Sequence, residues 1–152
     1  MIPELQDGVL PPGIRDCTME ELQQAFGQFR RSDRRPQLTE KLRRFVEDAQ
    51  QAGIAAAVII DGSYVTAKAE PNDIDLLLAL RSDFDLKEEL RPLEYNLQSK
   101  RMVRKLYGFD VLPAVEGSET YLRLLDFFSH VRPNDPEQQT SQLYKGLVRI
   151  TL

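Results

Sequence analysis

The chain has 152 residues, 41% of them hydrophobic, and a formal net charge of −4. This length suits one compact domain with a hydrophobic core and excludes two domains of ordinary size. The acidic balance argues against bulk affinity for nucleic acid, and no apolar run is long enough to cross a membrane. The N-terminal residues lack the pattern of a secretory signal peptide, and Cys17, the only cysteine, has no internal disulfide partner and no cluster of zinc ligands. We therefore expect a cytoplasmic protein with no membrane partner.

The first part of the chain, about 1–53, is predicted to be a helical lead-in. The stretch "GVLPPGIRD" should be extended or turn-rich, because paired prolines disfavour a helix. Thr18 and Glu21 form a capping-box pattern that opens a short helix reaching to about Phe26. A longer helix is expected over about 36–52, ending at Gly53. Its apolar face carries Leu38, Leu42, Phe45, Val46 and Ala49.

The middle part, about 54–115, is predicted to be the core. The apolar run from Ile54 indicates a buried strand, and the stretch after it, 62–72, reads as a loop with one helical turn. "DIDLLLAL" indicates a second buried strand and "FDVLPAV" a third. Between these two strands, residues 81–108 are predicted to be helical with an interruption near Pro92.

The last part, about 116–152, is predicted to hold a helix and a strand. Ser118 is a typical N-cap, and we assign Phe127 and Phe128 of that helix to the core. "RPNDPEQQTS" reads as a loop and "GLVRITL" as a last strand. Lys145 and Arg149 of this strand fit either a ligand pocket or an edge strand, and we favour the edge. The whole, 1–152, is predicted to be a single α/β (α+β) domain with a mixed sheet of about 3–5 strands flanked by helices.

Positive charge is clustered in two places despite the acidic total. Such clusters bind phosphates in some proteins, but more often they are helix faces and loops exposed to solvent. We favour the solvent-exposed interpretation here. The two clusters are Arg30, Arg31, Arg34, Arg35, Lys41, Arg43 and Arg44, and Lys100, Arg101, Arg104 and Lys105.

Two aspartates at the mouth of the second strand are the strongest functional signal. Side chains alternate along a strand, so Asp73 and Asp75 should share a face about 7 Å apart, and their like charges need something positive nearby. A divalent cation such as Mg²⁺ suits two carboxylates and keeps positions for water and phosphate oxygens. Asp110, at the start of the third strand, could reach the same site and help activate an attacking hydroxyl.

The loop before these aspartates fits a phosphate. Gly62 allows close approach of the backbone, and the N–H groups and hydroxyl around Ser63 are suitable donors. Asp61 fits equally well a hydrogen bond within the loop or a supporting role behind the site.

With these residues in order, the chain resembles the nucleotidyltransferase superfamily, whose catalytic domain is shared in outline with DNA polymerase beta. The pattern is "GS" at one strand end, D-x-D on the next strand and a later third Asp, matched by Gly62–Ser63, Asp73 with Asp75, and Asp110. The match covers about 54–114. More loosely, the whole chain resembles an uncharacterised family of small bacterial nucleotidyltransferase-like proteins.

This resemblance implies Mg²⁺ (or Mn²⁺) on Asp73, Asp75 and Asp110. It also implies a nucleoside triphosphate, most simply ATP, cradled by Gly62 and Ser63. Many small relatives carry an Ala-Arg-Gly stretch soon after the Gly-Ser, and here Lys68 stands as a point charge in its place, which weakens the expected grip on the triphosphate.

The implied function is metal-dependent transfer of a nucleoside monophosphate to a hydroxyl of a protein, an RNA or a small molecule. The alternative is a non-catalytic module of the same fold that binds a partner, as an antitoxin facing a cognate toxin or as a nucleotide sensor.

Overall fold

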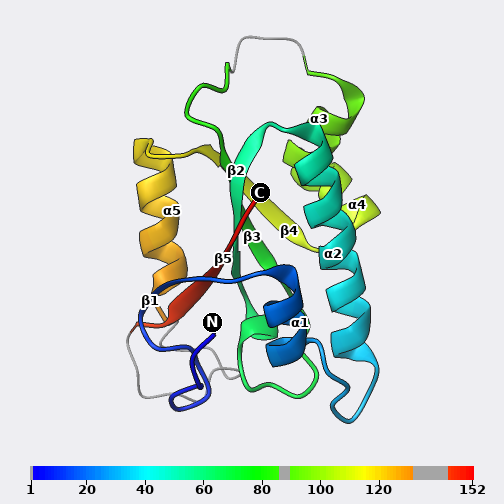
Figure 1. Cartoon of the computed structure of the whole chain (residues 1–152), viewed down its shortest axis with the longest axis vertical. Coiled ribbons are helices and arrows are strands. Elements are labelled where there is room, and N and C mark those ends of the chain that lie inside the picture. Colours follow the sequence, from blue (N-terminus) through cyan, green and yellow to red (C-terminus); the bar gives the residue numbers. More distant parts are fainter. Residues whose placement is uncertain (1, 86–89, 132–143) are drawn as a thin grey trace.

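The computed structural model describes residues 2–85, 90–131 and 144–152, and their strands form one mixed sheet between two layers of helices (Figure 1). The strand order is β1-β5-β2-β3-β4. β2 pairs antiparallel with β3 and β5, whereas β3–β4 and β1–β5 are parallel pairs. The strands are β1 (Gly13–Asp16), β2 (Ala55–Asp61), β3 (Asp75–Leu80), β4 (Asp110–Val115) and β5 (Gly146–Thr151).

The helices divide unequally between the two faces of the sheet. In Figure 1, α1, α2, α3 and α4 lie on one side of the strands and α5 lies on the other. The helices are α1 (Met19–Phe26), α2 (Arg34–Ala52), α3 (Pro92–Gln98), α4 (Lys100–Leu106) and α5 (Glu119–Ser129), and a single 3-10 turn, η1 (Ser63–Val65), follows β2. The predicted fold class is confirmed. In the part of the chain that the structure describes, no helix is both long and apolar enough to cross a membrane.

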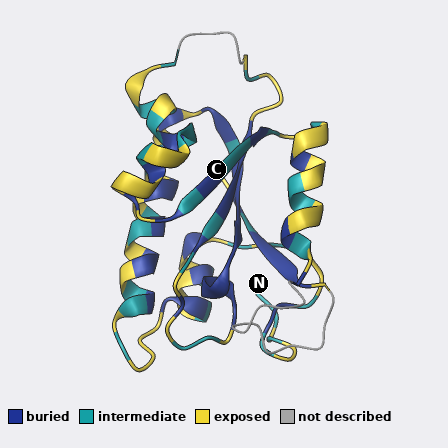
Figure 2. Cartoon of the chain, turned by 180° about the vertical axis from the view of Figure 1, so that it is seen from behind, coloured by how far each residue is buried: buried dark blue, intermediate teal, exposed yellow. Residues whose placement is uncertain are grey.

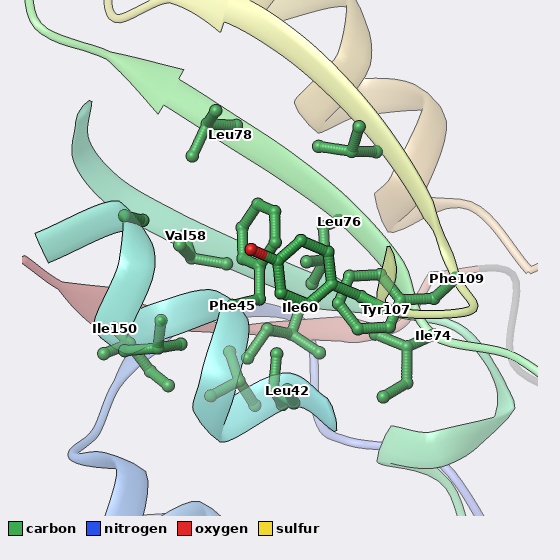
Figure 3. Packing of buried hydrophobic residues seen from close by; sticks show 14 of the residues in the cluster. Leu42, Phe45, Val58, Ile60, Ile74, Leu76, Leu78, Tyr107, Phe109 and Ile150 are labelled. Atoms are coloured by element: carbon green, nitrogen blue, oxygen red, sulfur yellow. The ribbon is translucent and has the colours of Figure 1, made fainter. Parts of the chain in front are cut away.

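Alternation along the strands fills a core on each face. Leu76 and Leu78 of β3 face α2 and pack in the larger core with Phe45 and Phe109, as Figure 3 shows. Leu77, between them, faces α5 and belongs to a smaller core with Phe128. β2 and β3, in the middle of the sheet, are almost entirely buried, and the outer helix faces are exposed (Figure 2). β3 is therefore apolar on both sides.

The caps that the sequence predicts are present. The Thr18 hydroxyl accepts a hydrogen bond from the backbone N–H of Glu21, and the Ser118 hydroxyl accepts one from Tyr121. Gly53 ends α2 in the left-handed conformation, with φ 69°.

Four expectations about the elements change. Pro92 does not interrupt a helix but begins α3, where its missing N–H costs nothing, and the break falls at Ser99. The extended lead-in contains β1, which was not predicted as a strand. β5 is an inner strand between β1 and β2, so the edge position favoured for Lys145 and Arg149 is wrong. The loop predicted over 132–141 lies outside the described residues.

Phe127 is the fourth change. It was assigned to the core together with Phe128, yet Phe127 is 57% exposed whereas Phe128 is 4% exposed. Neighbouring residues on a helix point in directions about 100° apart, and in α5 it is Phe128 that faces the sheet while Phe127 lies toward the edge of the helix face.

Candidate active site

Three carboxylates stand side by side where β2 ends and β3 and β4 begin. Asp61 is the register partner of Asp75 across the antiparallel pair, and Asp75 is the register partner of Asp110 across the parallel pair. Alternation puts all three on the face that α5 covers, two residues from Ile59, Leu77 and Leu112. Neighbouring strands are about 4.8 Å apart, so the three residues form a row across the sheet. We call Asp61, Asp75 and Asp110 the carboxylate row.

Asp73 does not continue this pattern, because β3 begins only at Asp75. Asp73 lies in the segment before the strand, and its Oδ1 accepts hydrogen bonds from the backbone N–H of Ser63 at 3.0 Å and from the Ser63 hydroxyl at 2.5 Å. The strand alternation used to predict a shared face for Asp73 and Asp75 therefore does not apply to Asp73. What holds Asp73 in place is the Gly-Ser turn.

The turn at Gly62 requires glycine for two reasons. Its φ of 95° with ψ of 179° is a conformation that only glycine adopts readily. A Cβ at this position would also lie 3.0 Å from the carbonyl oxygen of Asp73 and 3.1 Å from the backbone nitrogen of Asp75. Gly62 thus brings the end of β2 directly against the chain that enters β3.

The donors around Ser63 hold a negatively charged oxygen. The N–H and the hydroxyl of Ser63 both point to the Asp73 carboxylate, and the backbone N–H of Asn72 donates to the Ser63 hydroxyl at 3.1 Å. The N–H of Tyr64 donates to the carbonyl of Asp73 at 3.2 Å. The predicted phosphate donors are therefore arranged around an anion, and in this structure that anion is the protein's own Asp73.

Asp61, the first member of the carboxylate row, pairs with a lysine directly before β5. Lys145 Nζ lies 3.0 Å from Asp61 Oδ1, and the two side chains are only 6% and 8% exposed. Burial raises the pKa of Asp61, while the charge of Lys145 and hydrogen bonds from Lys145 and from the Gly62 backbone act to lower it. Of the two roles left open for Asp61, the structure favours the supporting one, as a buried ion pair behind the site.

Two arginines at the start of α2 hold the loop that follows Gly62. Arg35 is 1% exposed, and its guanidinium donates to the carbonyl oxygens of Phe26 at 3.0 Å, Tyr64 at 2.7 Å and Thr66 at 2.8 Å, and also to that of Lys68. Burial, followed by the charge of Arg30, lowers the pKa of Arg35 to about 10.

Arg34 binds the far end of the same loop, donating to the carbonyls of Pro71 at 2.9 Å and Asn72 at 3.0 Å. The expectation of a solvated cluster fails at Arg35. Its helical spacing from Leu38, Leu42, Phe45 and Ala49 is the signal that marks it as buried.

Asp75 and Asp110 also line a pocket of about 190 Å³ between the sheet, α4 and α5. The other residues around it are Leu76, Lys100, Leu112, Phe127 and Phe128, and we call this the Asp110 pocket. Arg104 on α4 approaches it as well, with Nε 4.0 Å from Asp110 Oδ1. Asp75 and Asp110 are therefore brought together as predicted.

Lys68, the remaining predicted residue, is partly buried in the loop, where its carbonyl binds Arg35. Lys68 does not line the Asp110 pocket.

The carboxylates fit a cation held partly by the protein. Among the described residues no group of three or more His, Cys, Asp or Glu side chains is set to hold a metal by itself. Two neighbouring carboxylates on one pocket wall are the set that Mg²⁺ commonly uses, with water and phosphate oxygens completing the coordination. The donor chemistry of Asp75 and Asp110 therefore fits Mg²⁺ together with a phosphate ligand, rather than a closed protein cage.

Comparison with known families identifies the family of the chain. The model of a family of unknown function, DUF6932, matches residues 3–151, so the chain belongs to that family. No curated protein and no solved structure matches the chain.

Proposed function

We propose that this member of the DUF6932 family is a metal-dependent nucleotidyltransferase that acts in the cytoplasm. The observation that carries the proposal is the register of Asp75 beside Asp110, with Asp73 held against the Gly-Ser turn next to them. Neighbouring carboxylates at the ends of buried strands repel each other and lose hydration, which is a cost that a structural role does not explain.

We assign one position in the site to a metal-bound phosphate and one to a hydroxyl. Asp73, Asp75 and Asp110 would hold Mg²⁺ or Mn²⁺, which when bound neutralises negative charge on the triphosphate. Ser63 supplies an N–H and a hydroxyl that bind an anionic oxygen, and a triphosphate oxygen would replace the Asp73 carboxylate on these donors. Lys68 would add a point charge from the adjoining loop.

The reaction follows from these positions. The acceptor hydroxyl loses its proton to Asp110 while its oxygen forms a bond to the α-phosphorus of a nucleoside triphosphate, most simply ATP. The bond from the α-phosphorus to the oxygen that bridges to the β-phosphate breaks, and pyrophosphate leaves with the bonding electrons. The acceptor carries the nucleoside monophosphate.

The experiment that tests this proposal is label transfer. The purified protein is incubated with each of the four nucleoside triphosphates labelled at the α-phosphate, with Mg²⁺ or Mn²⁺, cell lysate and total RNA. We expect label on one class of acceptor and loss of transfer in Asp75→Asn. The matched control is Asp83→Asn, because Asp83 is a carboxylate that is 72% exposed and lies beyond the opposite end of β3. Transfer that survives Asp75→Asn contradicts the proposal.

A second function is favoured by one observation. The donors of Ser63 already bind Asp73, as suits a module that binds a partner without chemistry. Such a module would act as an antitoxin against a cognate toxin or as a nucleotide sensor. The module and the enzyme differ in one measurable way. Asp75→Asn would abolish the activity of the enzyme, whereas it would leave the partner binding of the module intact.

A further inference from the structure

We infer that Lys145 keeps Asp61 from binding the metal and thereby makes metal binding at the carboxylate row depend on a nucleotide. This inference rests on the proposed function and concerns how its site is loaded. Asp75 has a register partner on each side, Asp61 on β2 and Asp110 on β4, so the strands place Asp61 about as near to Asp75 as Asp110 is. Asp61, however, is engaged by a buried lysine, with Lys145 Nζ 3.0 Å from Asp61 Oδ1.

Stability alone does not account for a buried ion pair at this place. The side chains of Asp61 and Lys145 are 8% and 6% exposed, so both charges have lost most of their water. The attraction between two buried charges often fails to offset that loss, and a well-packed apolar pair of similar volume is frequently as stable. An ion pair beside two further carboxylates has a use that an apolar pair lacks, because it places a fixed positive charge next to the row in the absence of metal.

The backbone around Lys145 fixes the position of this charge. The N–H of Lys145 donates to the carbonyl of Ser129 at the end of α5 at 2.8 Å, and the N–H of Gly146 donates to the carbonyl of Leu10 at 2.8 Å. A Cβ on Gly146 would lie 2.1 Å from the carbonyl oxygen of Pro11, so the two segments pack too closely for any side chain there. The place of Lys145 is therefore set by α5 and by the segment before β1, independently of any ligand.

The number of protein ligands determines what else the metal needs. With Asp61 paired to Lys145, two carboxylates of the row remain for Mg²⁺, and Asp73 beside them is held by Ser63. Mg²⁺ is commonly held by one or two carboxylates together with substrate phosphates. A triphosphate therefore completes the metal site, whereas a released Asp61 would complete it without a nucleotide. Lys145 is thus a positioning residue that acts on the metal through Asp61.

The test is the affinity of the full chain for Mn²⁺ without nucleotide, measured by equilibrium dialysis. We expect Lys145→Met to bind Mn²⁺ about tenfold more tightly than the wild type, because the released carboxylate of Asp61 joins the ligand set. The double variant Asp61→Asn/Lys145→Met should return to the wild-type affinity, since neither the added ligand nor the added net charge remains.

The matched control is Arg149→Met. This variant also removes one positive charge, and Arg149 pairs with a carboxylate outside the row, Asp16, which is 61% exposed. It should bind Mn²⁺ as the wild type does. Equal affinity of the wild type and Lys145→Met, or an equal gain in Arg149→Met, overturns the inference.

A nucleotide arm separates this inference from the proposed function. The dialysis is repeated with ATP equilibrated across the membrane, so that the excess of Mn²⁺ on the protein side is the bound ion. ATP that tightens Mn²⁺ binding much more in the wild type than in Lys145→Met supports both. Tighter binding by Lys145→Met, without any effect of ATP on the wild type, supports the role of Lys145 and contradicts the nucleotidyltransferase.

The double variant keeps the test decisive if Lys145→Met does not fold, which circular dichroism and urea unfolding check first. Asp61→Asn/Lys145→Met contains no unpaired charge at this place, so it should fold. Because Asp61 is not a ligand in the wild type, the double variant should bind Mn²⁺ with ATP as the wild type does. Loss of that binding, or its absence from the wild type, would overturn the inference.

Discussion

At the scale of single residues, Gly62 is the position where the backbone conformation restricts the type of side chain most. An alanine there would adopt a conformation that only glycine favours and would press its Cβ against the carbonyl of Asp73, 3.0 Å away. We expect Gly62→Ala to lower the free energy of unfolding by about 2–3 kcal/mol in urea titrations.

The control for Gly62→Ala is Gly117→Ala. Gly117 also has a positive φ, 80°, but has open space where a Cβ would stand, so this variant reports backbone strain alone. If both variants lose the same stability, the close approach of β2 to the entry of β3 has no energetic consequence.

Cys17 gives a prediction that depends on pH. Burial, followed by the charge of Glu21, raises the pKa of the Cys17 thiol to about 12 from an ordinary value of 9.0. The thiolate fraction of the folded protein at pH 8 is then on the order of a thousandfold lower than that of the unfolded chain. Alkylation by iodoacetamide should be correspondingly slow in buffer and fast in urea. Equal rates in the two conditions would show that the thiol is accessible and unshifted.

The same pKa difference affects stability. Because the folded thiol holds its proton up to a higher pH than the unfolded one, this group leaves stability unchanged below the unfolded pKa and reduces it as the pH rises above that value.

At the scale of elements, the N-terminal turn of α2 and the loop after β2 form one unit through Arg35. Its guanidinium is shared by four carbonyl oxygens, and a lysine, with one compact ammonium group, cannot span them. We expect Arg35→Lys to lower the free energy of unfolding by about 3 kcal/mol, since carbonyls that remain buried lose a charged donor.

A second readout follows the loop itself. Limited trypsin digestion should cut after Lys68 faster in Arg35→Met, where the loop loses its anchor, than in Arg123→Met, which removes an arginine that is 77% exposed on α5. Unchanged stability in Arg35→Lys together with unchanged cleavage of Arg35→Met would contradict the anchoring role of Arg35.

Most elements could be predicted because their signals are local. The caps at Thr18, Ser118 and Gly53 and the apolar runs of β2 and β3 act within a few residues of where they stand. The position of β5 between β1 and β2 depends on pairing between distant segments, which no local pattern records. The exposure of Phe127 depends on which face of α5 packs against the sheet, and this too is set by tertiary packing.

At the scale of the whole molecule, the ion pair of Asp61 and Lys145 joins the end of β2 to the segment that enters β5. Removing one partner leaves a buried charge without compensation, so we expect Lys145→Met to cost about 3–5 kcal/mol of stability. The double variant Asp61→Asn/Lys145→Met should recover part of that loss in thermal or urea unfolding. A double variant as unstable as the sum of the two single variants would show that the residues do not interact.

The candidate site could be predicted in part at this scale. Asp75 and Asp110 were predicted as neighbours from their places at two strand starts, and the register agrees. Lys145 was weighed for a ligand pocket but assigned to an edge strand, and Arg35 was assigned to a solvated cluster. Their contacts depend on segments that are distant in sequence, the entry of β5 and the start of α2. When the contacts of a charged residue lie far away in the sequence, a single amino-acid sequence does not distinguish that residue from an ordinary charged surface residue.

The measurement that tests the carboxylate site most directly is Mn²⁺ binding, followed by the electron paramagnetic resonance signal of free Mn²⁺ during a titration. We expect the wild-type chain to bind Mn²⁺ more tightly in the presence of ATP, because phosphate oxygens complete the coordination that Asp75 and Asp110 begin. Asp75→Asn and Asp110→Asn should lose this binding while Asp83→Asn keeps it. Absence of binding in the wild type with ATP, or undiminished binding in Asp75→Asn, would contradict the metal-binding role that we assign to Asp75 and Asp110.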